Sequence, residues 1–137
     1  MSSNLYTFSS ETLSGLKKFR FGSSRATQPQ AVIYEIDKET NEIKQQEVDG
    51  DIDSIETLVE ELPDNNPRFI VLSYPIKTKD GRLQSPLVML YWIPPTSNQA
   101  NKMLYAGAVE QFRDKAGVSK LIKIEDEDDF DDIEEQL

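Results

Sequence analysis

Between Ser97 and Gly117, apolar residues recur every three to four positions, a spacing that predicts one long amphipathic helix. Pro94 and Pro95 end the preceding element, because proline lacks an amide proton and restricts the residue before it. Thr96 or Ser97 can cap the start of the helix, and Gly117 suits the left-handed position after its end. The half of the helical wheel predicted to face the core carries Ala100, Leu104, Tyr105, Ala108, Val109, Phe112 and Ala116.

The other half of this helix is unusual for a solvated surface, because charged residues border a strip of small apolar ones. It carries Gln99, Lys102, Met103, Ala106, Gly107, Glu110, Arg113 and Asp114. A glycine inside a helix costs about 1 kcal/mol relative to alanine, so Gly107 needs an explanation. Close approach of a partner is one explanation, and simple tolerance of a weak helix former is the other. The face is therefore a candidate binding surface.

Two apolar segments before this helix predict central strands. Residues 68–74 (RFIVLSY) form a nearly continuous apolar run, typical of a strand buried on both faces. An Asp-Gly turn within Lys79–Arg82 returns the chain into a second run, residues 86–93 (PLVMLYWI). We expect two adjacent strands at the centre of a sheet, leading into the long helix.

The first part of the chain predicts a helix followed by a hairpin. Ser9 or Ser10 can cap a short helix over Glu11–Phe19. Strand-like segments at 31–37 and 43–49 flank a polar turn and predict the hairpin. The residues expected on the inner side of the helix are Leu13, Leu16 and Phe19.

The segment after the hairpin has two interpretations. Four acids at 49, 51, 53 and 60 match ligand positions of a calcium-binding EF-hand loop, but Ser54 stands where that loop needs glycine. The better interpretation makes Asp53 a helix cap, with Glu56 three residues later. We therefore expect no metal site but a helix whose inner residues are Ile55, Leu58, Val59 and Leu62.

The net charge of −10 is concentrated in one segment. Residues 125–137 contain nine acids and no base, and without them acidic and basic residues are nearly equal in number. Nucleic acid is therefore an unfavourable partner, because the chain has no net basic field. Phe130, Ile133 and Leu137 have helical spacing and predict a docked terminal helix, although a solvated acidic run is the alternative.

The composition excludes several kinds of chemistry. The chain has no histidine and no cysteine, which removes the commonest general base, the commonest metal ligand and the thiol nucleophile. It contains neither a dinucleotide-binding nor a P-loop motif, no apolar run of membrane-spanning length and no signal-peptide pattern. We expect one domain over residues 1–137, with no catalytic residues, cofactor, metal or membrane span, that acts through binding surfaces.

The predicted order is helix, hairpin, helix, two central strands, long helix, short strand (118–124) and terminal helix. This order resembles the actin-depolymerising-factor homology domain, and the local wording resembles its glia maturation factor branch. The similarity spans roughly residues 8 to 124, with segments that agree in order and spacing. The resemblance implies an α+β or α/β fold whose central mixed sheet of five to six strands has helices on both faces. The matching segments are LKKFRF (16–21), ELPDNNPRFIVLSY (61–74), DGR (80–82), PL (86–87) and MLYAG (103–107).

Two departures separate this chain from cofilin-like actin binders. Those proteins carry two basic residues near the start of the long helix, where this chain has Ala100 and Lys102. The turn between the central strands, residues 78–82, is also short beside the basic projecting loop of filament-severing relatives. Both departures are in keeping with the glia maturation factor family.

The resemblance implies two partner-binding surfaces. The first surface comprises Ser2, Ser3, Asn4, Lys102, Met103, Ala106, Gly107 and Glu110. The second surface, which charge alone suggests, comprises Lys17, Lys18, Arg20, Arg25, Lys79 and Arg82. Basic residues near position 20 also have a structural interpretation, because cations stabilise the C-terminal end of a helix.

The function implied by the resemblance is non-enzymatic. Glia maturation factors bind the actin-related protein 2/3 complex, dismantle filament branches and suppress branch nucleation. The resemblance also implies a monomer of the cytoplasmic cortical actin cytoskeleton, with weak affinity for actin and a nuclear pool as a further option. Two alternatives remain: a cofilin-like protein that binds and severs actin filaments, and a scaffold that binds through its acidic tail.

Overall fold

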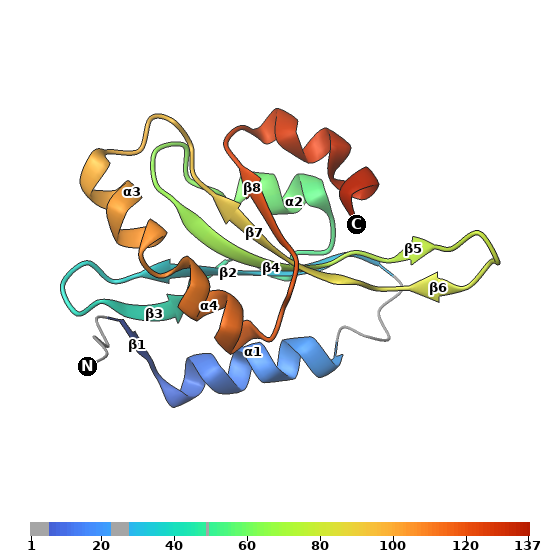
Figure 1. Ribbon diagram of the computed structural model, residues 1–137, viewed down its shortest axis with the longest axis horizontal. Coiled ribbons are helices and arrows are strands. Elements are labelled where there is room, and N and C mark those ends of the chain that lie inside the picture. Colours follow the sequence, from blue (N-terminus) through green and yellow to red (C-terminus); the bar gives the residue numbers. More distant parts are fainter. Residues whose placement is uncertain (1–5, 23–27, 49) are drawn as a thin grey trace.

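The computed structural model describes residues 6–22, 28–48 and 50–137. Helices and strands alternate in the order expected from the sequence (Figure 1). The helices are α1 (Ser10–Gly22), α2 (Ile55–Glu60), α3 (Gln99–Ala106), α4 (Val109–Ala116) and the 3-10 helix η2 (Glu127–Gln136). The strands are β1 (Thr7–Phe8), β2 (Gln30–Ile36), β3 (Glu42–Gln45), β4 (Arg68–Ser73), β5 (Ile76–Lys77), β6 (Leu83–Gln84), β7 (Leu87–Trp92) and β8 (Leu121–Ile124).

A mixed six-stranded sheet with the order β1-β3-β2-β4-β7-β8 forms the centre of the molecule. The outer pairs β1–β3 and β7–β8 are parallel, whereas the inner strands pair in antiparallel fashion. This confirms the predicted fold class and the central position of the strands that contain residues 68–74 and 86–93. None of the helices in the described part of the chain has the length and apolar character that a membrane span requires.

Both faces of the sheet are buried, because side chains alternate along its central strands. Phe69 and Val71 of β4 join one core with α1, α3 and α4. Ile70 and Leu72 join a second core with α2 and η2 on the opposite face. Figure 1 shows α1 and α4 on one side of the sheet, and α2 and η2 on the other. Apolar runs in β4 and β7 are therefore the consequence of helices on both faces.

Three details of the first helices differ from the sequence predictions. The first helix is longer than expected, and its cap is Ser9, whose hydroxyl accepts a hydrogen bond from the Thr12 amide at 3.1 Å. Leu13, predicted to face inward, is 39% exposed, because Thr12 and Leu16 form the buried line of α1. The cap of α2 is Ser54 rather than Asp53, since the Ser54 hydroxyl accepts from the Thr57 amide.

The acidic C-terminal segment folds back onto the sheet. Phe130 and Ile133 are 4% and 3% exposed, and Phe130 stacks on Trp92 with ring centroids 6.3 Å apart. The helical spacing of the apolar residues therefore reflects real packing, although the segment winds as the tighter 3-10 helix. Its acids remain mostly exposed at the surface.

Candidate functional site

The predicted long helix is two helices, and the break between them shapes the first surface. At the junction, the Ala108 amide donates to the carbonyl of Tyr105, a short i to i−3 bond, before α4 starts at Val109. Asn98, not Thr96 or Ser97, caps α3 by accepting from the Asn101 amide at 2.8 Å. The break changes the direction of the chain while Ala108, Val109 and Phe112 stay buried in one core.

The break also corrects part of the helical wheel. Ala100, predicted to face the core, is exposed, whereas Asn101 is only 3% exposed. The Asn101 side-chain amide donates to the Asn66 side chain at 2.6 Å, which ties α3 to the loop before β4. A buried polar residue with a satisfied hydrogen bond is energetically acceptable, and apolar periodicity does not reveal it.

The exposed side of α3 carries the apolar strip predicted from the sequence. Met103 is 66% exposed, and Ala106 and Gly107 are exposed beside it. Lys102 is half-buried at one border of this strip. An isolated exposed apolar residue needs no explanation, but Met103 and Ala106 lie on a helix whose opposite side is fixed in the core. These residues therefore form a rigid platform.

Tyr105 fixes the inner side of this platform. It is 3% exposed, and its hydroxyl oxygen accepts from the Ile36 amide at 2.9 Å and from the Arg68 guanidinium at 3.4 Å. Its ring packs edge-on against Phe69 at a centroid distance of 5.3 Å. Burial raises the pKa of the Tyr105 hydroxyl, so this group stays neutral at physiological pH. Packing and hydrogen bonds thus hold α3 in place beneath Met103.

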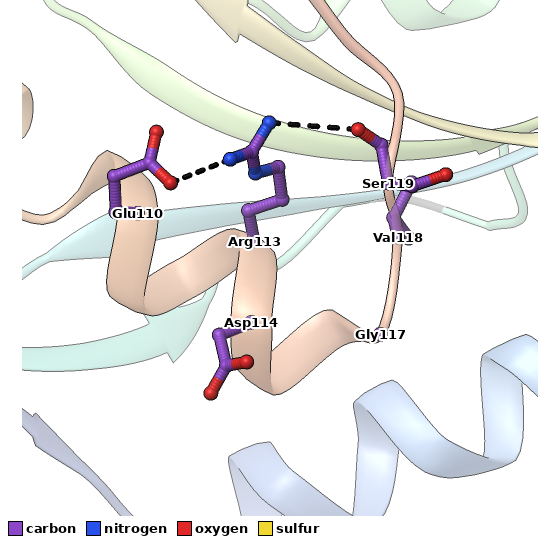
Figure 2. A pocket seen from close by; sticks show the side chains of 6 residues that line it. All are labelled: Glu110, Arg113, Asp114, Gly117, Val118 and Ser119. Carbon is purple, nitrogen blue, oxygen red and sulfur yellow. Dashed lines mark hydrogen bonds and ion pairs between the residues drawn. The ribbon is translucent and has the colours of Figure 1, made fainter.

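The other border of the platform is a charged pair in α4. Figure 2 shows Glu110 and Arg113 pointing toward one another at the rim of a shallow pocket. Their charged groups are 2.6 Å apart, and the Arg113 guanidinium also donates to the carbonyl of Ser119 at 3.5 Å. Glu110 is thus exposed but already paired, so it offers a partner less free charge than the sequence suggested.

Gly107 is explained by a contact within the chain. A Cβ atom added at Gly107 would lie 2.5 Å from the hydroxyl oxygen of Tyr6. That hydroxyl donates to the carbonyl of Leu104 at 2.8 Å. The close approach inferred from the sequence therefore exists, and Tyr6 makes it. Ser2, Ser3 and Asn4, the other predicted members of the first surface, lie outside the described residues.

The structure divides the second surface into separate groups. Lys17 and Lys18 are exposed on α1, whereas Lys79 and Arg82 lie at the end of the β5–β6 ribbon, which projects beyond the sheet and past the end of α1 (Figure 1). Arg25 lies outside the described residues. The basic residues of this set therefore do not form one compact patch.

Arg20 has a structural role that the sequence prediction offered as an alternative. Its guanidinium lies over Gly117 at the end of α4, where any Cβ atom would collide with it. Gly117 also has a positive φ of 70°, which glycine adopts without strain. The positive charge of Arg20 thus lies near the C-terminal end of α4, where it stabilises the helix.

The tip of the ribbon is partly neutralised from within. Asp80 accepts a short hydrogen bond from the Thr78 hydroxyl and pairs with the Arg82 guanidinium at 3.0 Å. These two contacts, that of Thr78 first, hold the pKa of the Asp80 carboxyl below its ordinary value. Lys79 has no such neighbour among the ion pairs of the described residues.

Sequence reasoning missed three residues at these surfaces. Tyr6 was read as part of an extended lead-in, and no local pattern indicates that it reaches residues almost one hundred positions away. Lys77 and the 57% exposed Leu83 lie on the ribbon, which the sequence suggested only as a turn. Among the described residues, no cluster of three or more acidic side chains is placed to hold a metal ion.

Comparison with known proteins identifies the family. The model of the family described as cofilin/tropomyosin-type actin-binding protein matches residues 5–137. Protein AIM7 of Saccharomyces cerevisiae is 42% identical over 149 residues, covering 98% of this chain and 97% of the relative. Human glia maturation factor beta is 32% identical over 117 residues, covering 84% of this chain and 79% of the relative.

Solved structures agree with these relatives. The solution structure of glia maturation factor from Caenorhabditis elegans superposes with a TM-score of 0.79 at 36% identity, covering 100% of both chains. The crystal structure of Streptomyces griseoflavus cofilin shares the fold, with a TM-score of 0.74 at 20% identity and 96% of both chains covered. The chain therefore belongs to the cofilin/actin-depolymerising-factor homology family, in its glia maturation factor branch, and has an actin-regulatory role.

Proposed function

We propose that this protein binds the actin-related protein 2/3 complex, dissociates actin filament branches and suppresses the nucleation of new ones, without catalysing a covalent reaction. Its proposed place of action is the cytoplasmic cortical actin network. Membership of the glia maturation factor branch supports this proposal, because the resemblance of the sequence to that branch implies this partner. The exposed side of α3 supplies the physical means.

The observation that carries the proposal is the platform formed by Met103, Ala106 and Gly107. Its centre is apolar and exposed, and its borders carry Lys102 and the Glu110–Arg113 pair. An apolar centre with a polar rim is the usual anatomy of a protein–protein interface. The low relief of Ala106 and Gly107 suits insertion into a groove of the partner, with Met103 as the adaptable anchor.

The mechanism follows from differential binding. A protein that binds one conformation of the complex more tightly than another shifts the population toward that conformation by the difference in binding free energy. Here the favoured conformation would be the one that no longer holds the branch. A rigid α3 platform suits this task, because a surface that adapted to both conformations would discriminate less between them.

The second surface would contribute mainly electrostatic attraction. Lys17, Lys18 and Lys79 are exposed, and exposed charges are screened by salt and contribute modestly to affinity. Their separation over α1 and the ribbon suits a wide partner or two neighbouring subunits. Arg20 would take little part, because its guanidinium lies against α4.

A cofilin-like function is the second candidate, and one observation favours it. The β5–β6 ribbon projects further than the short turn predicted from residues 78–82, and it carries Lys77, Lys79 and Arg82 (Figure 1). The exposed Ala100 argues against this candidate, since it leaves α3 with one basic residue near its start.

Single-filament imaging separates the two functions. Branched filaments assembled with the complex are exposed to the wild-type protein beside unbranched filaments in the same field. We expect branches to dissociate while unbranched filaments keep their length. The Met103→Asp variant serves as the matched control, because it places a charge on the platform without disturbing the core. Shortening of unbranched filaments at the same concentration would instead support the cofilin-like function.

A further inference from the structure

The Tyr6 side chain connects the N-terminal end of the described chain to the α3–α4 junction. Its hydroxyl donates to the Leu104 carbonyl at 2.8 Å and occupies the space that a side chain at position 107 would fill. Its ring packs against the core shared by α1, α3 and α4. Burial raises the pKa of this hydroxyl, so it remains a hydrogen-bond donor at neutral pH.

Little else holds this part of the chain on the helix side of the sheet. The strand after Tyr6, β1, has two residues and lies at the edge of the sheet, paired only with β3. Thr7 donates to the Asn41 carbonyl at 3.0 Å, which fixes the chain to the β2–β3 turn and not to a helix. The direction in which the chain leaves β1 toward residues 2–4 is therefore set largely by Tyr6.

We propose that Tyr6 is a positioning residue, which seats in the notch left by Gly107 and holds the N-terminal arm beside the Met103 platform as one binding unit. Gly107 thus serves the interface indirectly, by leaving room for Tyr6. This inference rests on the proposed function for its partner, whereas the seat itself is tested without any partner. Neither Tyr6 nor this role for Gly107 is evident from the helical pattern.

The geometry predicts that two substitutions compensate for one another. Gly107 has a helical φ of −68°, so alanine is compatible with its backbone, and the conflict arises only with the Tyr6 hydroxyl. The nearest ring carbon, Cζ, lies 3.5 Å from the added Cβ, an ordinary contact distance. Gly107→Ala should therefore displace Tyr6 in the wild-type background and be tolerated in the Tyr6→Phe background.

The experiment is a double-mutant cycle with Tyr6→Phe, Gly107→Ala and the combined variant. Thermal unfolding and amide hydrogen exchange of residues 6–8 and 104–108 report on the seat in the free protein. Tyr74→Phe, on the other face of the sheet, controls for loss of a tyrosine hydroxyl. Gly22→Ala, where nothing lies within 4 Å of the added Cβ, controls for a helical glycine.

For the free protein, we expect Gly107→Ala to speed exchange in both segments by about two- to tenfold, the size expected from loss of one neutral hydrogen bond. Tyr6→Phe should speed exchange to a similar extent. The combined variant should be no worse than Tyr6→Phe alone. Independent, additive effects, or normal exchange in Gly107→Ala, would show that Tyr6 does not occupy this seat.

For the positioning role, the same variants are titrated in the branch-dissociation assay. We expect Gly107→Ala to raise the half-maximal concentration several-fold while the rate at saturation stays at the wild-type value, because the platform itself is intact. Equal half-maximal concentrations would overturn the positioning role even if the seat is real. If the wild-type protein fails to bind the complex, the proposed function fails and the positioning role fails with it, whereas the exchange cycle still decides the seat.

Discussion

The α3–α4 face and the β5–β6 ribbon both expose residues to solvent, but different forces hold them. Beneath Met103, Tyr105 packs on Phe69 and accepts two hydrogen bonds, so the backbone of the face belongs to the core. The ribbon has one two-residue ladder of its own and contacts within its turn, such as Asp80 with Arg82. A short isolated hairpin is marginally stable in water.

This difference predicts different contributions to binding. A rigid apolar surface gives affinity and discrimination between partner conformations, because little ordering is needed on contact. A projecting charged ribbon speeds encounter and responds to salt, but it loses conformational freedom when it binds. We therefore expect substitutions on α3 to have larger effects than substitutions on the ribbon.

Gly107→Arg should have the largest effect, since it perturbs both the platform and the Tyr6 seat. Displacing the Tyr6 hydroxyl removes one hydrogen bond of roughly 0.5–1.5 kcal/mol together with some packing. We expect a fall in Tm of a few degrees and more than tenfold weaker binding to the complex. From the sequence alone, the expectation was an almost unchanged Tm, because Gly107 was placed on an open face.

Differential scanning calorimetry and a pull-down of the complex check this prediction together. Gly22→Arg is the matched control, because the added Cβ meets no atom within 4 Å. Normal binding by Gly107→Arg would remove both α3 and its Tyr6 seat from the interface.

Met103→Asp should weaken binding almost as much without affecting the fold. The side chain is 66% exposed, so its replacement removes little core packing. A charge placed in the desolvated centre of an interface is expected to lower affinity by about tenfold or more, equivalent to about 1.4 kcal/mol. Leu13→Asp, another exposed apolar position on α1, is the control. Equal loss of binding by both variants would mean that general surface charge matters and not the platform.

The large features of this fold could be predicted from the sequence because they depend on local pattern. Continuous apolar runs at 68–74 and 86–93 indicated central strands, and the spacing of Phe130 and Ile133 indicated a packed terminal helix. The apolar strip at Met103 and Ala106 followed from the wheel. In each case the signal and the structure have the same period.

What remained hidden depends on distant partners. The break after Ala106 does not interrupt the apolar spacing, because Ala108 and Phe112 reach the same core in either geometry. The Tyr6 contact joins residues 98 positions apart. The ribbon projects because the β2–β4 and β4–β7 ladders both end at Ser73, and no local pattern marks that edge.

The paired change Lys79→Ala with Arg82→Ala should have a smaller effect than either α3 substitution. Exposed charges contribute roughly 0.2–1 kcal/mol each, and Asp80 already neutralises part of this turn. We expect binding about two- to fivefold weaker at low salt and a smaller difference at high salt. Lys17→Ala with Lys18→Ala tests the α1 group in the same way. A titration against ionic strength that gives parallel curves for wild type and variants would contradict an electrostatic role.

Ala100→Arg should have the smallest effect, and it decides between the two actin-related functions. Ala100 is exposed near the start of α3, two positions before Lys102, so arginine restores the second basic residue of cofilin-like relatives without entering the core. One exposed charge is expected to raise affinity for monomeric actin by about twofold to fivefold. Fluorescence titration of labelled monomeric actin measures this change, with Ala100→Gln as a control of similar size without charge.

The variant should still leave unbranched filaments intact, because severing would also need strain applied at a second contact. The ribbon that would make this contact is marginally held and carries Asp80 among its bases. Severing by Ala100→Arg alone would show that the ribbon already suffices as a filament contact. In that case the missing charge on α3, and not the structure of the ribbon, would separate this protein from its filament-severing relatives.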